Sequence, residues 1–405
     1  MSVFSALVGQ THAVATLSAA AADAAAVLVG GPAGSMTHAW LLTGPPGSGR
    51  SIAARAFAAA LQCPSGGCGT CPSCRTTLAG THPDLEVLRT EALSIGVAEV
   101  RELVLGAARR PSRGRWQVVL VEDADRLTEP AANAALKAIE EPGERTVWLL
   151  CAPAPEDLLP TVRSRCRHVL LHTPPLADVA AHLVEHDGVD QAMAAFAARA
   201  AQGHIGRARR LALDEQARLR RSDVLRVPFA VARVSDAVMA AGALVESAGE
   251  EATAASAELD AAESAALGRA LGEGSTGRGL PASARAALKD LERAQKTRAT
   301  RLRRDALDRA LTDLAALYRD VLAVQFGAEV TLTAEELRPQ VRRLAEASTP
   351  ESTLARIEAV LSARAAIEAN VAPLLAVEAL AVRLWDPASR PADSAVTALG
   401  ALTSR

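Results

Sequence analysis

Short apolar runs alternate with helical patterns between residues 37 and 171 of the chain. The runs with the length and composition of strands are Ala39–Leu42, Leu85–Leu88, Gln117–Val121, Thr146–Leu150 and His168–Leu171. The segments with helical spacing are Arg50–Gln62, Val97–Arg110, Pro130–Glu141 and Glu156–Val162. Because strands that alternate with helices form parallel sheets, this pattern predicts an α/β domain with helices on both faces of the sheet.

Beyond residue 171 the pattern is helical throughout. Residues 173–215 are few for an independent domain, and we expect them to form a small helical lid on the first domain. Helical patterns then continue to residue 385, with apolar faces at Leu307–Leu322 and again at Ala363–Leu384. Gly272–Gly279 has the composition of a flexible loop. The sequence indicates no role for the loose segment around 235–300.

The length of 405 residues also calls for more than one core. Apolar residues make up 49% of the chain but aromatic residues only 2%, so Ala, Leu and Val fill the cores and favour helices. The predicted domains are an α/β domain at 1–172, the lid at 173–215, an all-α domain at 216–388 and a poorly ordered tail at 389–405.

Charge and the N-terminal sequence limit the classes of function. The formal net charge of −2 argues against an electrostatic grip on nucleic acid by the whole protein. Any DNA contact would therefore come from a local patch or from partners. The opening MSVFSALVGQ lacks the basic and apolar regions of a signal or membrane helix. We expect a cytoplasmic protein with reduced thiols and no membrane contact.

The stretch Gly44–Ser51, GPPGSGRS, directly follows the first predicted strand. It has the spacing of the phosphate-binding loop G-x-x-x-x-G-K-[ST], with Arg50 in place of the lysine. Gly44, Gly47 and Gly49 keep the loop backbone, and Ser51 keeps the hydroxyl that binds magnesium, so ATP and Mg²⁺ are candidate ligands. The planar fork of arginine does not replace a compact ammonium. A general drift to arginine is the alternative explanation, since the chain has only three lysines.

A pair of carboxylates follows the third predicted strand. Working nucleotide sites place a metal-binding Asp before a water-activating Glu, whereas Glu122 and Asp123 come in the reverse order. Each side chain therefore misses its role by one methylene. The alternative interpretation is that these acidic residues only end the strand.

Four of the six cysteines lie within twelve residues, directly after the helix that follows the loop. Their spacing is Cys63-x4-Cys68-x2-Cys71-x2-Cys74. Two Cys-x2-Cys turns let four sulfurs converge on one zinc ion and leave no open position. The sequence thus predicts a structural zinc module at 63–74; four unligated thiols are the alternative.

Four further motifs carry a resemblance to a known family. Phe4–Gln10 resembles the adenine-side segment of AAA+ proteins. His82–Asp84, Asn133–Pro142 and Leu159–Cys166 are similar to bacterial clamp-loader subunits, and most of all to the delta prime type of DNA polymerase III. The likeness covers residues 1–215 and extends more weakly over the C-terminal helices.

This resemblance implies an AAA+ fold, a lid, and a C-terminal helical collar that joins five subunits into a ring. The partners would be gamma/tau and delta type subunits, and the ring would load the sliding clamp onto primer–template DNA for the DNA-directed DNA polymerase. Delta prime subunits serve as a stator without ATPase turnover. The motif Ser164-Arg165-Cys166 implies that Arg165 acts as an arginine finger at the ATP site of a neighbouring subunit.

Further departures from active subunits agree with this role. Cys151-Ala-Pro153 lacks a polar sensor after the fourth strand, and Gly206 stands where the sensor arginine aligns, with Arg207 one position later. Two other interpretations stay open. An active gamma/tau-like motor would carry lysine and an Asp-Glu order, and a stand-alone zinc protein with a decayed phosphate loop would leave Ser-Arg-Cys unexplained.

Overall fold

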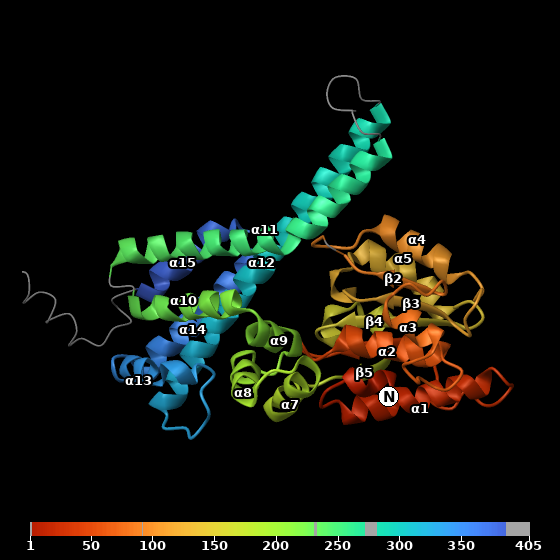
Figure 1. Cartoon of the computed structure of the whole chain (residues 1–405), viewed down its shortest axis with the longest axis horizontal. Coiled ribbons are helices and arrows are strands. Elements are labelled where there is room, and N and C mark those ends of the chain that lie inside the picture. The colour runs from red at the N-terminus through yellow and green to blue at the C-terminus, as the bar shows by residue number, and fades with distance from the viewer. Residues whose placement is uncertain (1, 91, 231–232, 272–281, 386–405) are drawn as a thin grey trace, which may run out of the picture. The chain divides into compact units, whose positions relative to one another are not determined.

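The computed structural model describes residues 2–90, 92–230, 233–271 and 282–385. The chain forms two compact units, Met1–Leu213 and Asp214–Arg405 (Figure 1). The predicted tail at 389–405 and the predicted loop at 272–279 lie outside the described residues. Among the described helices, none combines the length and the apolar character needed to cross a bilayer.

The first unit is built on a parallel sheet of five strands in the order β2-β3-β4-β1-β5. The strands are β1 (Ala39–Thr43), β2 (Leu85–Leu88), β3 (Gln117–Val121), β4 (Thr146–Ala152) and β5 (Arg167–Leu170). Every residue of β1, β3 and β4 is buried, which explains why these strands read as continuous apolar runs.

Helices cover both faces of this sheet, so the predicted α/β architecture is confirmed. Alternate residues of β1 point to opposite faces: Trp40 packs with α1 (Thr11–Val27) and α2 (Arg50–Gln62). Leu41 packs with α4 (Val97–Ala107) and α5 (Glu129–Glu140) on the other face. The remaining short elements are η1 (Val3–Ala6), α3 (Pro72–Leu78) and η2 (Ala124–Arg126).

The predicted single helix at Glu156–Val162 is wrong. The segment forms a 3₁₀ turn, η3 (Pro155–Asp157), and one turn of helix, α6 (Pro160–Arg163). Pro160 disfavours helical geometry at the preceding residue, and Leu159 is extended with φ −54° and ψ 137°. Proline is favourable in the first turn of the new helix, where its missing N–H has no partner to lose.

Three short helices complete the first unit and pack on one another. They are α7 (Leu176–Asp187), α8 (Gln191–Ala200) and α9 (Ile205–Leu213). Val179 and Leu183 of α7 are fully buried, as is Ala194 of α8.

The second unit is all helical. It contains α10 (Glu215–Ala230), α11 (Val234–Leu271), α12 (Ala282–Gln325), η4 (Glu335–Leu337), α13 (Arg338–Glu346), α14 (Pro350–Glu368) and α15 (Pro373–Trp385). The described residues between 235 and 300 are thus helical rather than loose. Leu307 and Leu311 of the apolar face on α12 are buried against Val360 of α14 and Val377 of α15.

The apolar positions at Ala363–Leu384 do not belong to one helix. Helix α14 ends at Glu368, and Asn370 has the left-handed φ of 68° that terminates helices. Pro373 then begins α15. Of the predicted face, Ile367 and Leu380 are buried, whereas Leu374 and Leu375 are 45% and 61% exposed.

Candidate functional site

The predicted phosphate loop joins the end of β1 to the start of α2. Gly44 donates its N–H to the carbonyl of Pro153, 3.1 Å away, which ties the loop to the end of β4. A Cβ at Gly44 would lie 2.4 Å from the carbonyl oxygen of Leu171, so no side chain fits there. Gly49 ends the loop in a left-handed conformation before the first turn of α2. The free N–H groups of that turn form an anion-binding end.

We call the helices α7–α9 and the residues that join them the lid, and a histidine of this segment covers the loop. A Cβ at Gly47 would come within 2.2 Å of the His204 ring, so the imidazole lies directly on the loop backbone. His204 Nδ1 accepts the N–H of Arg207 at 3.2 Å, which orients the ring. The buried Gln10 side chain ties the loop to the segment after β5, since it donates to the carbonyls of Ser48 and His172. The glutamine belongs to the predicted adenine-side motif.

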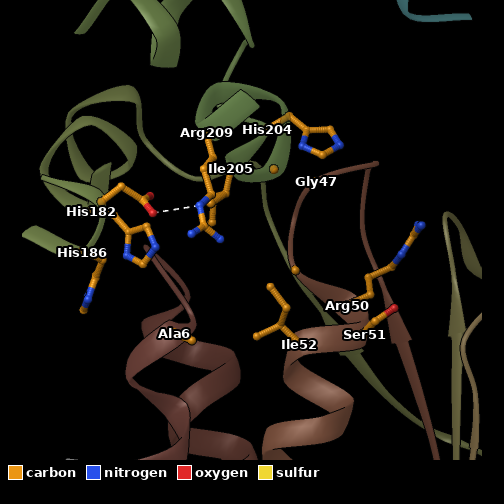
Figure 2. Close-up of a pocket in the computed structure, with 13 residues that line it drawn as sticks. Ala6, Gly47, Arg50, Ser51, Ile52, His182, His186, His204, Ile205 and Arg209 are labelled. Carbon is orange, nitrogen blue, oxygen red and sulfur yellow. Dashed lines mark ion pairs between the residues drawn. The ribbon is translucent and has the colours of Figure 1, made fainter. Parts of the chain in front are cut away.

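A cavity of about 510 Å³ lies between the loop and the lid. Figure 2 shows Ala6 and Ile52 on one side of it and His182 and Arg209 on the other. The volume is in the range of sites that hold small ligands and cofactors. Burial and the neighbouring His186 lower the pKa of His182, so its imidazole is neutral near pH 7.

Sequence reasoning missed the lid wall of this cavity. Gly206 lines it as aligned, but the arginine on the wall is Arg209 and not Arg207. Arg209 Nε lies 2.8 Å from Asp187 Oδ1 (Figure 2). The four-residue spacing of His182 and His186 on α7 was the one signal available in the sequence. It does not predict a cavity wall, because the sequence does not show that α7 packs opposite the loop.

Two residues that were predicted to bind the nucleotide are bound by other groups of this chain. Arg50 Nη1 donates to the carbonyl of Gly44 at 2.5 Å, so the guanidinium binds the backbone of its own loop. Glu122 Oε1 lies 2.7 Å from Arg55 Nε of α2, with the Glu122 side chain only 9% exposed. A charge of the chain therefore neutralises the first carboxylate of the acidic pair.

The other carboxylates at this end of β3 are half-buried. Burial raises the pKa of Asp125, helped by the carboxylate of Asp123 and opposed by Arg126 and Arg50. Burial likewise raises the pKa of the Cys151 thiol at the predicted sensor position of β4. A neutral, enclosed thiol there offers little polar contact to a phosphate.

The predicted arginine finger lies on the surface between α6 and β5. Arg165 is 39% exposed and does not line the cavity of its own chain. Its guanidinium forms an ion pair with Glu140 at the end of α5, and Nη1 donates to the Thr161 carbonyl at 2.6 Å. Ser164 Oγ accepts from the same Nη1 at 3.2 Å. The motif thus holds Arg165 in place.

Cys166, the last residue of the motif, is half-buried. Its Sγ lies 3.4 Å from the carbonyl of Val162, and burial raises the pKa of the thiol to about 12. The side chain serves to pack the turn.

The four clustered cysteines meet at one point. Their sulfurs all lie within 4.8 Å of one another, with Cys63 Sγ 3.7 Å from Cys68 Sγ and 3.8 Å from Cys71 Sγ. Four sulfurs bound to one zinc at about 2.3 Å would lie about 3.8 Å apart. The cluster is therefore a candidate metal centre whose spacing fits a closed tetrahedral site.

Backbone groups support the same cluster. Cys68 N–H points to Cys63 Sγ and Cys74 N–H to Cys71 Sγ, each at 3.4 Å. Hydrogen bonds from the backbone and hydroxyl of Thr70 lower the pKa of Cys68 to about 6, whereas burial raises the pKa of Cys74. Such N–H···S contacts orient ligand sulfurs and stabilise negative charge on them.

The His82–Asp84 motif has a structural role in the first unit. The buried Asp84 carboxylate accepts the N–H groups of Ser112 and Arg113 at 2.6 Å and 2.9 Å, and also that of Gly114. It thereby holds the loop that leads into β3. The motif lies outside the cavity.

Known proteins match the part of the chain that contains these sites. Residues 31–175, which include the phosphate loop, the cysteines and Ser164–Cys166, match the family model described as DNA polymerase III, delta subunit. The delta prime subunit of Pseudomonas aeruginosa DNA polymerase III is 44% identical over 135 residues, 32% of this chain and 41% of that protein. Residues 31–175 thus resemble subunits of DNA polymerase III.

Gamma/tau subunits of the same polymerase are also similar. That of Mycobacterium bovis is 34% identical over 210 residues, 49% of this chain and 35% of the relative. The chain thus spans less than half the length of the curated relatives it matches. A gamma subunit-related protein from Thermotoga maritima is a structural neighbour with TM-score 0.39 and 16% identity, covering 86% of this chain and 93% of that one. The parallel five-stranded sheet of this region shows the predicted α/β fold.

Proposed function

We propose that this chain is a delta prime-type stator of the clamp loader, one that hydrolyses ATP negligibly itself. It would join gamma/tau and delta type subunits in a five-subunit ring that loads the sliding clamp onto primed DNA. The observation that carries the stator role is the pairing of Arg50 with Gly44 and of Glu122 with Arg55. The residue at the position of the phosphate-binding lysine and the residue at the position of the metal-binding aspartate are thus both engaged within the chain.

We expect the isolated chain to hydrolyse ATP at the background rate. Arg55 neutralises Glu122 at the position of the metal-binding carboxylate, and Asp123 is one methylene too short at the position that activates water. The measurement is phosphate release by the full chain, with Ser51→Ala as the matched control. Turnover that Ser51→Ala abolishes would contradict the stator role. Binding of nucleotide without turnover remains compatible, because the loop amides and the start of α2 stay available.

An active gamma/tau-like motor is the second candidate, and one observation favours it. The likeness to the mycobacterial gamma/tau subunit extends over 210 residues, against 135 for the Pseudomonas delta prime subunit. The same phosphate-release measurement separates the two candidates. Turnover by the chain alone would select the motor.

We further propose that Arg165 is supplied in trans to the ATP site of a neighbouring subunit. Its exposure and its position outside the cavity of its own chain support this role. A guanidinium always carries its charge and presents a fork that suits the oxygens of a transferring phosphate. Glu140 would orient the guanidinium until that neighbour is present.

We propose that the cysteine cluster holds a structural zinc. The fit of the sulfur spacing to a tetrahedron and the absence of a non-sulfur ligand among the four support this assignment. The site is also tied to the rest of the unit: Arg115 Nη1 donates to the Cys63 carbonyl at 2.8 Å, and Val3 N–H to the Gly67 carbonyl at 3.0 Å. The metal would therefore connect the N-terminal segment, α2 and β3.

The second unit is proposed as the collar that assembles the ring. Most of its predicted apolar face on α12 is covered within the unit, but Leu374 and Leu375 of α15 remain exposed. We expect Leu374→Ser with Leu375→Ser to weaken assembly with the other subunits by about tenfold or more, since buried leucine contributes over 1 kcal/mol. The measurement is co-elution of the reconstituted complex.

Val29→Ser provides the control for this test, because Val29 is an 85% exposed apolar residue of the first unit. Thermal denaturation should show that both variants fold, as exposed side chains contribute little to stability. Full assembly by the double variant would remove α15 from the collar interface.

A further inference from the structure

The two longest helices of the second unit extend beyond its core as an arm. On α11 the last core residue is Ala248, and on α12 the first is Ala306. We define the arm as residues 249–271 of α11 and 282–305 of α12. Figure 1 shows the two helices running side by side past the other helices of this unit.

Inside the arm, the acidic residues of α11 bind an arginine of α12. Arg298 is only 9% exposed, and its Nη2 lies 2.8 Å from Glu263 Oε1. Arg298 Nη1 lies 2.5 Å from Asp260 Oδ1, and Gln295 donates to the Asp260 carbonyl at 3.1 Å. These contacts fix the register of the two helices. They also engage the carboxylates of Asp260 and Glu263 between the helices.

Four other cations of α12 face solvent. Arg285, Lys289, Arg293 and Lys296 are all exposed, and their spacing of four, four and three residues puts them on one helix face. At 1.5 Å per residue this basic stripe is about 16 Å long. None of the four side chains makes an ion pair within the part of the chain that the structure describes.

This local charge differs from that of the whole protein. The arm residues of α12 hold eight Arg and Lys against three Asp and Glu, in a chain of net charge −2. Two of the chain's three lysines are in the stripe. Asp290 and Glu292 are the exposed acids on the same part of α12, and Glu258 is exposed on α11. The stripe remains a row of cations with no partner in the described chain.

We propose that this stripe binds the phosphate backbone of duplex nucleic acid without reading its sequence. A duplex carries one charge per about 1.7 Å of its axis, so it offers phosphates to all four cations at once. Ala286, three residues before Lys289, is exposed beside the stripe and leaves room for the backbone to approach. The amide of Gln295 is held by Asp260 within the arm and is not available to a base edge. An acidic protein would need carboxylates at matching intervals, so nucleic acid fits better.

The test uses the full chain and a fluorescein-labelled 30-base-pair duplex of mixed sequence, titrated by anisotropy between 50 and 200 mM salt. If four phosphates are contacted, the logarithm of the binding constant should fall linearly with the logarithm of the salt concentration, with a slope of about −3.6. Lys289→Glu with Lys296→Glu should make that slope less steep by about two. The double variant should also weaken binding at 50 mM salt by about tenfold or more. Lys289→Gln with Lys296→Gln repeats the test by removing the two positive charges without adding negatively charged side chains.

The matched control is Arg342→Glu with Arg343→Glu on α13, two exposed arginines whose reversal changes net charge equally. We expect it to weaken binding by less than about threefold. Equal losses in both reversals, or no binding by the wild-type chain at 50 mM salt, would overturn the proposal. Displacement of the duplex by polyglutamate at equal charge concentration would instead show a site for acidic protein. The proposal does not rest on the stator role, and failure of the ATPase prediction would leave it intact.

Discussion

Replacing Arg165 with alanine is expected to lower ATP turnover by about 10³-fold or more at the loader site that this arginine faces. Arg165 is exposed, so its removal should leave the fold and the cysteine cluster of its own chain intact. The charge on the transferring phosphate would lose its trans partner. The measurement is DNA- and clamp-stimulated ATP turnover by the loader reconstituted with the variant chain, compared with wild type.

Arg163→Ala is the control, because Arg163 is two residues away and equally exposed, at 40% against 39%. We expect near-normal turnover from this variant. Arg165→Lys should restore little, since a point charge does not reproduce the bidentate fork. Unchanged rates in a normally assembled loader with Arg165→Ala would make Arg165 an ordinary surface residue.

Glu140 adds a detail to this expectation. In the isolated chain its carboxylate holds the Arg165 guanidinium at the end of α5. A half-exposed ion pair of this kind is weak, so a phosphate from a neighbouring site could replace it. Glu140→Gln should leave assembly unchanged and separate the orienting role of Glu140 from the charge of Arg165. An effect on turnover much smaller than that of Arg165→Ala is the expected result.

Much of the first unit could be predicted because its signals are local. Buried parallel strands need continuous apolar runs, and the helix that follows the loop has the predicted bounds, Arg50–Gln62. The cysteine cluster could also be predicted, since all four cysteines lie within twelve residues. Even the wrong helix at Glu156–Val162 was correctable from sequence, because Pro160 marks a boundary.

The side-chain pairings that decide the site could not be predicted. Arg55 and Glu122 lie 67 residues apart, and His204 meets Gly47 only once the lid has packed on the loop. No periodicity records such contacts, which depend on the tertiary fold. Likewise the arm gave no sequence signal beyond helical spacing, and the outward direction of its cations follows from the inward pairing of Arg298.

Zinc removal is expected to have the second large effect, this time on stability. The metal would join three elements at Cys63–Cys74, and a ligand that binds only the folded state stabilises it in proportion to the logarithm of its affinity. At a thousandfold excess over the dissociation constant, loss of the metal should lower the melting temperature of a domain of this size by about 8 °C or more. Elemental analysis should give one zinc per wild-type chain.

Cys68→Ser isolates the metal from the packing, because Cys68 is half-buried whereas Cys63 and Cys74 are fully buried. It should lower both the zinc content and the melting temperature. Cys166→Ser, a half-buried thiol outside the cluster, should lower neither much. If wild type prepared with ample zinc contained no stoichiometric metal, the four sulfurs would be free thiols held by backbone N–H groups. If Cys68→Ser lost the metal yet melted like wild type, zinc would bind here without supporting the link between α2 and β3.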